Sequence, residues 1–186
     1  MALKPVFKDA DERMAKSVEH VRHELARVRT GRATPALLDT VKVDYYGTQT
    51  PLNQVASIST PEARLLVIQP WEKRLIGDIE KAILQADLGL NPSNDGNVVR
   101  VPIPELSEER RQDLLKLVKK FCEEGRIAVR NVRREANDAI KKLEKAHEIS
   151  EDNSHDAINE IQEKTNVHIK EIDDLYAIKE KEILED

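Results

Sequence analysis

Residues 107–145 read SEERRQDLLKLVKKFCEEGRIAVRNVRREANDAIKKLEK, and apolar residues recur there every three or four positions. This spacing is typical of an amphipathic α-helix, and about forty residues at ~1.5 Å per residue would extend over roughly 60 Å. Ser107 is a suitable N-cap, and Glu108 and Glu109 fall in the first turn, where the helix dipole favours negative charge. The apolar positions that we expect to be buried are Leu114, Val118, Phe121, Gly125, Ala128, Val132, Ala136, Ala139 and Leu143.

A helix this long needs partners of similar length, and the sequence offers two. Residues 7–28 carry apolar side chains at the same spacing, and a further helix is expected after Ser150, with apolar positions as far as Ile183. Ser150 has the pattern of an N-cap, because the acidic Glu151 and Asp152 follow it in the first turn. Three amphipathic helices can bury their apolar faces by packing against one another, so we expect one antiparallel three-helix bundle.

The segment between the first two helices, residues 31–104, has a different composition. It contains seven of the eight prolines and five of the six glycines. A turn is expected at Tyr46-Gly47-Thr48, and residues 71–88 have a helical pattern. Short runs typical of β-strands cover residues 40–46, 55–59, 65–69 and 98–103. These features predict a small α+β unit inserted into the bundle.

The expected fold class is therefore α+β, with two domains. The bundle takes residues 1–30 and 105–186, and the inserted domain takes residues 31–104. Domains joined by thin crossings can rotate relative to one another unless their shared interface is large. The hinge residues that we expect at the two crossings are Thr30, Gly31, Arg32, Ile103, Pro104 and Glu105.

Composition excludes several classes of protein. Charged residues make up 35% of the chain and aromatic residues only 3%, which argues against a large aromatic β-sandwich core. The single cysteine, Cys122, allows neither an internal disulfide nor a Cys-rich zinc site, and it fits a reducing compartment. The opening residues lack the apolar core of a signal peptide, and no run approaches ~18 apolar residues, so we expect no membrane span.

The formal net charge of -5 conceals an uneven distribution along the chain. Residues 110–145 carry twelve basic and six acidic side chains, whereas residues 146–186 carry four basic and thirteen acidic ones. Residues 1–109 are nearly balanced, with fourteen basic and sixteen acidic side chains. A mildly acidic chain can therefore present one strongly basic surface.

Much of this positive charge falls on one side of the long helix. At ~100° per residue, six basic residues lie within about 100° of one another around the helix, apart from the expected apolar positions. We call this set the basic face, and it consists of Lys119, Arg126, Arg130, Arg133, Arg134 and Lys141. A rigid row of arginines suits a phosphate backbone, because guanidinium forms bidentate contacts with phosphate. The low aromatic count disfavours base stacking, so an RNA partner would be bound through its backbone and shape.

Two other interpretations remain open from the residues alone. A charged helix face can simply be solvated, or a helical scaffold or chaperone-like module could present it to an acidic protein. Catalysis finds little support, because the sequence has no glycine-rich phosphate loop and no nucleophile elbow. His20 and His23 do not match a zinc signature, and Cys122 has no activating pattern around it. We therefore expect no catalytic residue, no cofactor and no metal.

Several segments together resemble the ribosome recycling factor family, in order and over nearly the whole chain. They are residues 29–35 (RTGRATP), 45–47 (YYG), 50–52 (TPL), 87–92 (DLGLNP), 100–102 (RVP), 108–111 (EERR), 129–137 (VRNVRREAN) and 149–152 (ISED). Each segment alone is modestly specific, but the series at these separations is very specific. Two small departures keep the local chemistry, since Ser107 stands where the family usually has Thr and Glu135 where it usually has Asp.

The resemblance implies an L-shaped molecule, with a three-helix bundle and a smaller inserted β/α/β domain on flexible hinges. It also implies a protein that binds the large ribosomal subunit after translation termination. With the GTPase elongation factor G and GTP, such a protein splits the post-termination complex and releases the subunits, mRNA and tRNA. The chain itself would be a cytoplasmic monomer without enzymatic activity or cofactor, because GTP hydrolysis would belong to the partner.

The resemblance further implies which residues bind. Arg130 and Arg133 would be the main contacts of the long helix with the rRNA of the large subunit. The inserted domain would meet elongation factor G, and ribosomal proteins would be additional contacts. Together with the rest of the basic face and the hinge end of the bundle, the arginines expected to bind rRNA are Arg29, Arg32, Arg111, Arg126, Arg130, Arg133 and Arg134.

Overall fold

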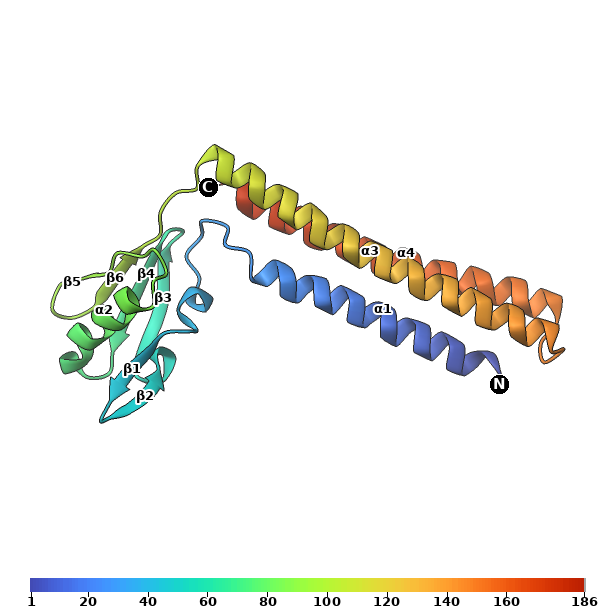
Figure 1. Ribbon diagram of the computed structural model, residues 1–186, viewed down its shortest axis with the longest axis horizontal. Coiled ribbons are helices and arrows are strands. Elements are labelled where there is room, and N and C mark those ends of the chain that lie inside the picture. Colours follow the sequence, from blue (N-terminus) through green and yellow to red (C-terminus); the bar gives the residue numbers. More distant parts are fainter. Residues whose placement is uncertain (186) are drawn as a thin grey trace. The chain divides into compact units, whose positions relative to one another are not determined.

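Three long helices form one of the two units of the computed structural model, which describes residues 1–185 (Figure 1). They are α1 (Leu3–Ala26), α3 (Glu108–Lys145) and α4 (Glu151–Leu184). All three helices pack against one another, and α3 runs opposite in direction to both α1 and α4. The predicted antiparallel three-helix bundle is therefore confirmed.

The turn between α3 and α4 is set by local chemistry. His147 adopts a left-handed backbone conformation with φ +57°, and the N–H of Glu148 donates to the carbonyl oxygen of Leu143 at 3.0 Å. Ser150 then caps α4 as predicted, because its Oγ accepts a hydrogen bond from the N–H of Asn153 at 3.1 Å. The reversal of the chain is thus encoded within a few neighbouring residues.

The buried face of α3 is rotated by about 40° from the face that the apolar spacing predicted, toward the side of α4. Val129 and Ile140 are buried although they were not among the expected positions, and Cys122 is buried beside them. Phe121, Ala128, Ala139 and Leu143, which we expected to be buried, are only half-buried. The reason is that α4 makes the more extensive contact with α3, so burial shifts from the α1 edge of the predicted face toward α4. The full set of buried residues is Leu114, Val118, Cys122, Gly125, Val129, Val132, Ala136 and Ile140.

The second unit contains two sheets, both antiparallel. Strands β1 (Lys42–Tyr45) and β2 (Thr48–Pro51) form a hairpin. A four-stranded sheet has the order β3-β4-β6-β5. Its strands are β3 (Ala56–Glu62), β4 (Leu65–Pro70), β5 (Ser93–Asn94) and β6 (Val99–Pro102). The four predicted strand runs correspond to β1, β3, β4 and β6. Neither β2 nor β5 was predicted, because both are short and largely polar.

The helix of this unit, α2 (Ile76–Gln85), is shorter than the predicted 71–88. Glu72 is extended, and the 3-10 turn Lys73–Leu75 precedes the helix. Two further 3-10 turns cover Pro35–Leu38 and Leu52–Gln54.

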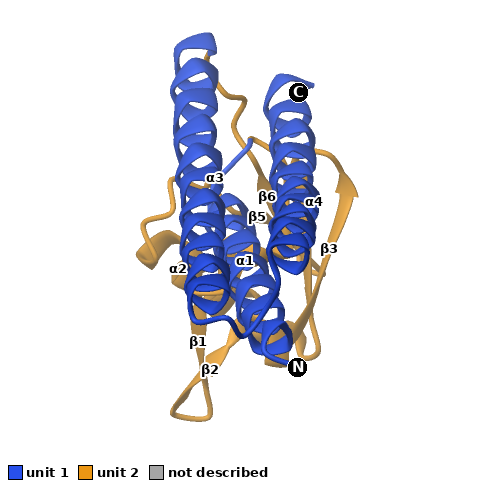
Figure 2. Cartoon of the chain, turned by 90° about the vertical axis from the view of Figure 1, so that its right-hand side faces the viewer, with its two compact units in different colours: residues 1–30, 108–185 blue, residues 31–107, 186 orange. Residues whose placement is uncertain are grey.

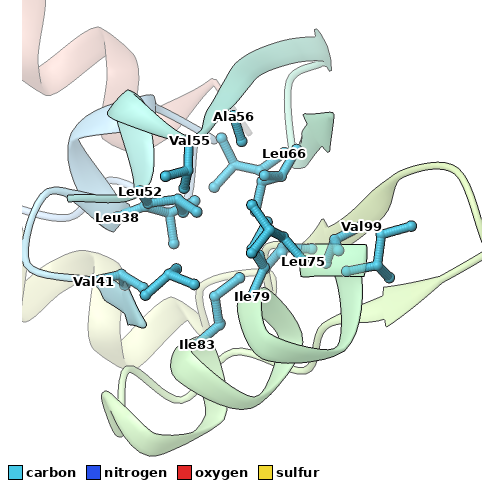
Figure 3. Close-up of a cluster of buried hydrophobic side chains, with 14 of the residues drawn as sticks. Leu38, Val41, Leu52, Val55, Ala56, Leu66, Leu75, Ile79, Ile83 and Val99 are labelled. Carbon is cyan, nitrogen blue, oxygen red and sulfur yellow. The ribbon is translucent and has the colours of Figure 1, made fainter. Parts of the chain in front are cut away.

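The hydrophobic core of the second unit lies between α2 and the sheets. Leu75, Ile79 and Ile83 are at most 1% exposed, and Figure 3 shows them among buried side chains of the strands and turns. Leu66 of β4 and Val99 of β6 belong to the same cluster and are fully buried. The small unit therefore has a core of its own, separate from the interior of the bundle.

The β1–β2 hairpin turns at Tyr46-Gly47, as predicted. Both residues have left-handed backbone conformations, with φ 52° and 82°. The N–H of Gly47 donates to Oδ1 of Asp44 at 2.8 Å, which holds the turn. Two-residue turns of this kind favour Asn, Asp or Gly at their first position, and a bulky residue there costs on the order of 1 kcal/mol. Tyr46 is therefore locally strained.

The chain passes twice between the two units. One unit comprises residues 1–30 and 108–185, and the other comprises residues 31–107 (Figure 2). The second crossing thus falls after Ser107, slightly beyond the predicted boundary at Pro104. At the first crossing Gly31 has φ +81°, a conformation that glycine adopts without strain.

Gly125 lies where α3 has no room for a side chain. A methyl group there would overlap Cγ2 of Val21 on α1 and lie 3.2 Å from Cδ1 of Ile172 on α4. We expect Gly125→Ala to lower the free energy of unfolding by about 1–2 kcal/mol, because overpacking outweighs the gain of ~1 kcal/mol in helix propensity. Urea unfolding followed by far-UV circular dichroism measures the change.

Gly77→Ala is the matched control, because a methyl group on Gly77 of α2 meets nothing within 4 Å. This variant is expected to be neutral or more stable than the parent by up to ~1 kcal/mol. If Gly125→Ala were as stable as Gly77→Ala, the close approach of the three helices at this point would be wrong.

Candidate nucleic-acid interface

The outward part of the basic face is bounded by contacts from α3 to its two neighbours. Arg13 of α1 forms a 2.6 Å ion pair with Glu135, and Arg126 forms a 2.7 Å ion pair with Asp173 of α4. Because a helix turns ~100° per residue, Glu135 and Arg126 lie on opposite sides of α3. The sector between them, on the side away from the bundle interior, remains open to solvent.

Four residues of the basic face lie in this open sector. Lys119, Arg134 and Lys141 are exposed, and the side chain of Arg130 is 38% exposed. The Nη1 of Arg130 donates to Oε1 of Glu123 at 3.2 Å, and the Nη1 of Arg134 donates to Oδ1 of Asn131 at 3.4 Å. These side chains keep much of their surface accessible to a large anionic partner.

Arg126 departs from the prediction that the whole basic face stands apart from the buried face. Its side chain is only 20% exposed and pairs with Glu123 at 3.2 Å as well as with Asp173. Burial is the largest single influence and works to lower the pKa of Arg126, but the hydrogen bond and charge of Asp173 together with the hydrogen bond to Glu123 outweigh it, so the pKa is raised. The sequence could not show this, because α4 covers the edge of α3 on which Arg126 lies. Arg126 therefore links two helices of the bundle.

Arg133 lies on the same edge as Arg126, next to α4. It is half-buried, and its Nη1 donates to Oε1 of Gln162 on α4 at 3.2 Å. This bond is between a charged donor and an uncharged acceptor, so it leaves the positive charge of Arg133 uncompensated. Arg133 thus holds a fixed position at the border of the basic face.

Glu123 is the one acidic residue that pairs with arginines of the basic face from within α3, among the ion pairs of the described residues 1–185. It contacts Arg126 and Arg130, both at 3.2 Å. Its hydrogen bonds with Arg126 and Arg130 lower the pKa of Glu123. Glu123 therefore stays charged at neutral pH, and its negative charge neutralises part of the positive charge of the basic face.

Arg29 belongs to a groove where α1 ends and α3 begins. The groove has a volume of about 400 Å³, and Arg27, Arg29 and Arg110 line it together with apolar side chains such as Leu117. Arg27 and Arg110 were not among the predicted site residues. The helical phase of Arg110, on the α1 side of α3, was the signal that could have identified it.

The two other predicted arginines lie elsewhere. Arg111 is directed to the end of α4, where its Nε donates to the carbonyl oxygen of Ile183 at 3.2 Å, and it also pairs with Glu108 at 3.5 Å. Its side chain is only 22% exposed, so it fastens α3 to α4. Arg32 is exposed and belongs to the second unit. The structure therefore does not bring all seven predicted arginines onto one surface.

Other kinds of site find no support in residues 1–185. No group of His, Cys, Asp and Glu side chains in this range could hold a metal ion. Burial raises the pKa of the Cys122 thiol, which makes a reactive thiolate less accessible. Over the same range, none of the helices has the length and apolar character that crossing a membrane requires.

Comparison with known proteins gives a consistent result over nearly the whole chain. A family model described as ribosome recycling factor matches residues 21–184. A ribosome-recycling factor of Syntrophomonas wolfei is 55% identical over 183 residues, which cover 98% of this chain and 99% of that protein. A ribosome-recycling factor of Bacillus cereus is 58% identical over 180 residues, covering 97% of each chain.

Two solved structures are similar in fold as well as in sequence. A solution structure of a ribosome recycling factor superposes with a TM-score of 0.77 at 45% identity, covering 100% of this chain and 99% of that one. A second match has a TM-score of 0.67 at 49% identity, covering 99% of this chain and 100% of that one. It is the Thermus thermophilus ribosome recycling factor placed with Escherichia coli elongation factor G on the E. coli post-termination complex.

Proposed function

Because this chain belongs to the ribosome recycling factor family, we propose that the basic face of α3 is the surface that binds the RNA of the large ribosomal subunit. The chain acts in ribosome recycling, and its partners are the ribosome and elongation factor G. In this role it binds after translation termination and, with elongation factor G and GTP, splits the complex into subunits, mRNA and tRNA.

The observation that carries the RNA assignment is the fixed row of arginines on α3. Arg130, Arg133 and Arg134 lie within little more than one turn of one continuous helix, whose 38 residues make it a rigid support. The acidic residues of the chain are concentrated instead in residues 146–186, mostly on α4. This asymmetry would orient the bundle, because only its α3 side attracts a phosphate backbone.

We propose that these arginines have different tasks. We assign Arg130, Arg133 and Arg134 to direct phosphate contact, with Lys119 and Lys141 extending the charged surface. Arg126 and Arg111 act indirectly, since each is tied to α4 and holds α3 in position. Arg29 contributes at the groove where α1 ends and α3 begins.

Movement between the two units would convert binding into subunit separation. We propose hinges at Thr30, Gly31 and Arg32 and at Ile103, Pro104 and Glu105. The positive φ of Gly31 and the missing N–H of Pro104 favour irregular backbone at these places. A rigid bundle held on RNA would transmit a push from the partner, while the hinges allow the second unit to swing.

Such a protein needs no catalytic residue of its own. We propose that GTP hydrolysis belongs to elongation factor G and that this chain contributes binding and mechanical coupling. Because its partners work on the translating ribosome, we place the chain in the cytoplasm. A subunit-splitting assay with and without elongation factor G and GTP tests the whole proposal, and purified chain alone is expected to hydrolyse no GTP.

Arg130→Ala and Arg133→Ala are expected to weaken binding to isolated large subunits. Removing one charge-assisted hydrogen bond to phosphate should reduce the binding free energy by roughly 1.5–3 kcal/mol. Neither residue is fully buried, so the urea unfolding midpoint should change little. Co-sedimentation at moderate salt measures the affinity, and a helical scaffold without ribosome binding would stay in the supernatant.

Lys170→Ala is the matched control for these variants. Lys170 is an exposed cation on α4, and it pairs with Asp174 at 3.0 Å outside the basic face. Its removal should leave the affinity for large subunits nearly unchanged. If Lys170→Ala and Arg133→Ala lost the same affinity for large subunits, the attraction would be unspecific, and α3 would not be the RNA-binding surface.

Glu123→Gln is expected to act in the opposite direction. Removing the carboxylate releases Arg126 and Arg130 from an exposed ion pair, whose strength is about 0.2–1 kcal/mol. Affinity for large subunits should therefore rise by about 1.5- to 5-fold at low salt. Glu124→Gln, an exposed neighbour that pairs with Lys120, provides the comparison. A loss of affinity in Glu123→Gln would mean that Glu123 itself supports the bound state.

A further inference from the structure

A row of polar side chains, none of them acidic, lies on the edge of α4 that borders the basic face. At ~100° per residue these side chains fall within about 60° of one another around α4, over roughly three turns. All of them are exposed. We call this set the polar strip, and it consists of His155, Asn159, Gln162 and Asn166.

Hydrogen bonds hold the polar strip beside the basic face. Oε1 of Gln162 accepts from Nη1 of Arg133 at 3.2 Å, and Nε2 of Gln162 donates to Oδ1 of Asn166 at 2.8 Å. Nearer the start of α4, the amide nitrogen of Asn159 lies 3.3 Å from Nδ1 of His155. The strip thus continues the surface of α3 onto α4 with side chains that are ordered before a partner binds, which reduces the entropy lost on binding.

The polar strip is unusual on α4, because this helix carries most of the acidic residues that follow residue 146. Over residues 155–166 the acidic side chains lie about 100–160° around the helix from Gln162. They are Asp156, Glu160 and Glu163.

The same edge of α4 treats two arginines of α3 differently. Asp173 neutralises Arg126 in a 2.7 Å ion pair, whereas Arg133 meets the amide of Gln162. The amide fixes the position of Arg133 and leaves its charge available. Since the strip carries no carboxylate, it does not repel an RNA backbone that lies on α3.

The polar strip offers hydrogen bonds in both directions rather than charge. A side-chain amide donates and accepts, and so does a neutral imidazole, whereas arginine and lysine only donate. A phosphate only accepts, so the amide oxygens of the strip find no donor in it. The ribose 2′-hydroxyl both donates and accepts, and it is displayed in the wide, shallow minor groove of an A-form RNA helix.

We propose that the polar strip of α4 binds ribose 2′-hydroxyl groups of the rRNA whose phosphates lie on the basic face. This inference rests on the proposed function, which makes large-subunit rRNA the partner of α3. It assigns two kinds of contact to two neighbouring helices. The basic face supplies the part of the affinity that depends on salt, and the polar strip supplies a part that does not.

The double variant Asn159→Ala/Asn166→Ala tests the strip without removing a charge. Affinity for large subunits should fall by about 2- to 10-fold for each uncharged hydrogen bond lost. The slope of the logarithm of the association constant against the logarithm of salt concentration should keep its parental value, because no phosphate contact is lost. Both residues are exposed, so the urea unfolding midpoint should change little.

Asn153→Ala is the matched control for the double variant. Asn153 is an exposed amide of the same helix, but it lies about 180° around α4 from Gln162. Its removal should change neither the affinity nor the salt slope.

Hydroxyl radicals identify the occupant of the strip, because they cleave RNA by attacking its ribose. Fe(II)–EDTA tethered to the cysteine of Asn166→Cys should cleave the rRNA of bound large subunits at a few neighbouring nucleotides. The same group in Asn153→Cys should cleave those nucleotides much more weakly. The parent chain treated with the same reagent controls for Cys122, which is buried.

Three results would overturn the inference. They are parental affinity in Asn159→Ala/Asn166→Ala, a reduced salt slope in that variant, and no rRNA cleavage from position 166. Full affinity in both Arg130→Ala and Arg133→Ala would instead contradict the proposed function, and cleavage from position 166 would still decide whether the strip faces rRNA.

Discussion

The position of α3 between α1 and α4 is the constraint on which the helical unit depends. Val21 of α1 and Ile172 of α4 both reach α3 at Gly125, where only a hydrogen atom fits. Two sides of α3 are consequently buried, and a single sector remains for polar residues. The exposed charges of α3 are therefore confined to that sector and extend along the helix axis. The packing of the bundle therefore limits where on α3 the basic face can lie.

The same packing makes the basic face rigid. Arg126 and Arg133 are held by Asp173 and Gln162 on α4, so the border of the face is fixed by groups on a second helix. Fixed side chains lose less conformational entropy when they bind than freely rotating ones do. The same ion pairs reduce the number of hydrogen-bond donors available to RNA, because Glu123 occupies donors of Arg126 and Arg130 that a phosphate could otherwise use. The ion pairs thus keep the arginine side chains in place, but they also occupy some of the donors that could contact phosphate.

The sequence predicted the features that depend on neighbouring residues. The N-cap at Ser150, the turn at Tyr46-Gly47 and the period of the long helices all follow from local patterns, and the structure contains each of them. Features that depend on distant residues were missed. Arg111 bonds to a carbonyl 72 positions away, and Tyr45 bonds to Glu72 across 27 positions. A helical projection of α3 alone could not show that α4 covers one edge of the basic face, so it placed Arg126 in solvent.

Salt dependence of the affinity for large ribosomal subunits tests the central claim most directly. If the basic face binds phosphates, the logarithm of the association constant falls linearly with the logarithm of the salt concentration. The double variant Arg130→Ala/Arg133→Ala should then reduce the steepness of that line by roughly 1.4–1.8, at about 0.7–0.9 for each phosphate that is no longer neutralised. A parent chain whose affinity does not respond to salt, or a double variant with the parental slope, would contradict the account.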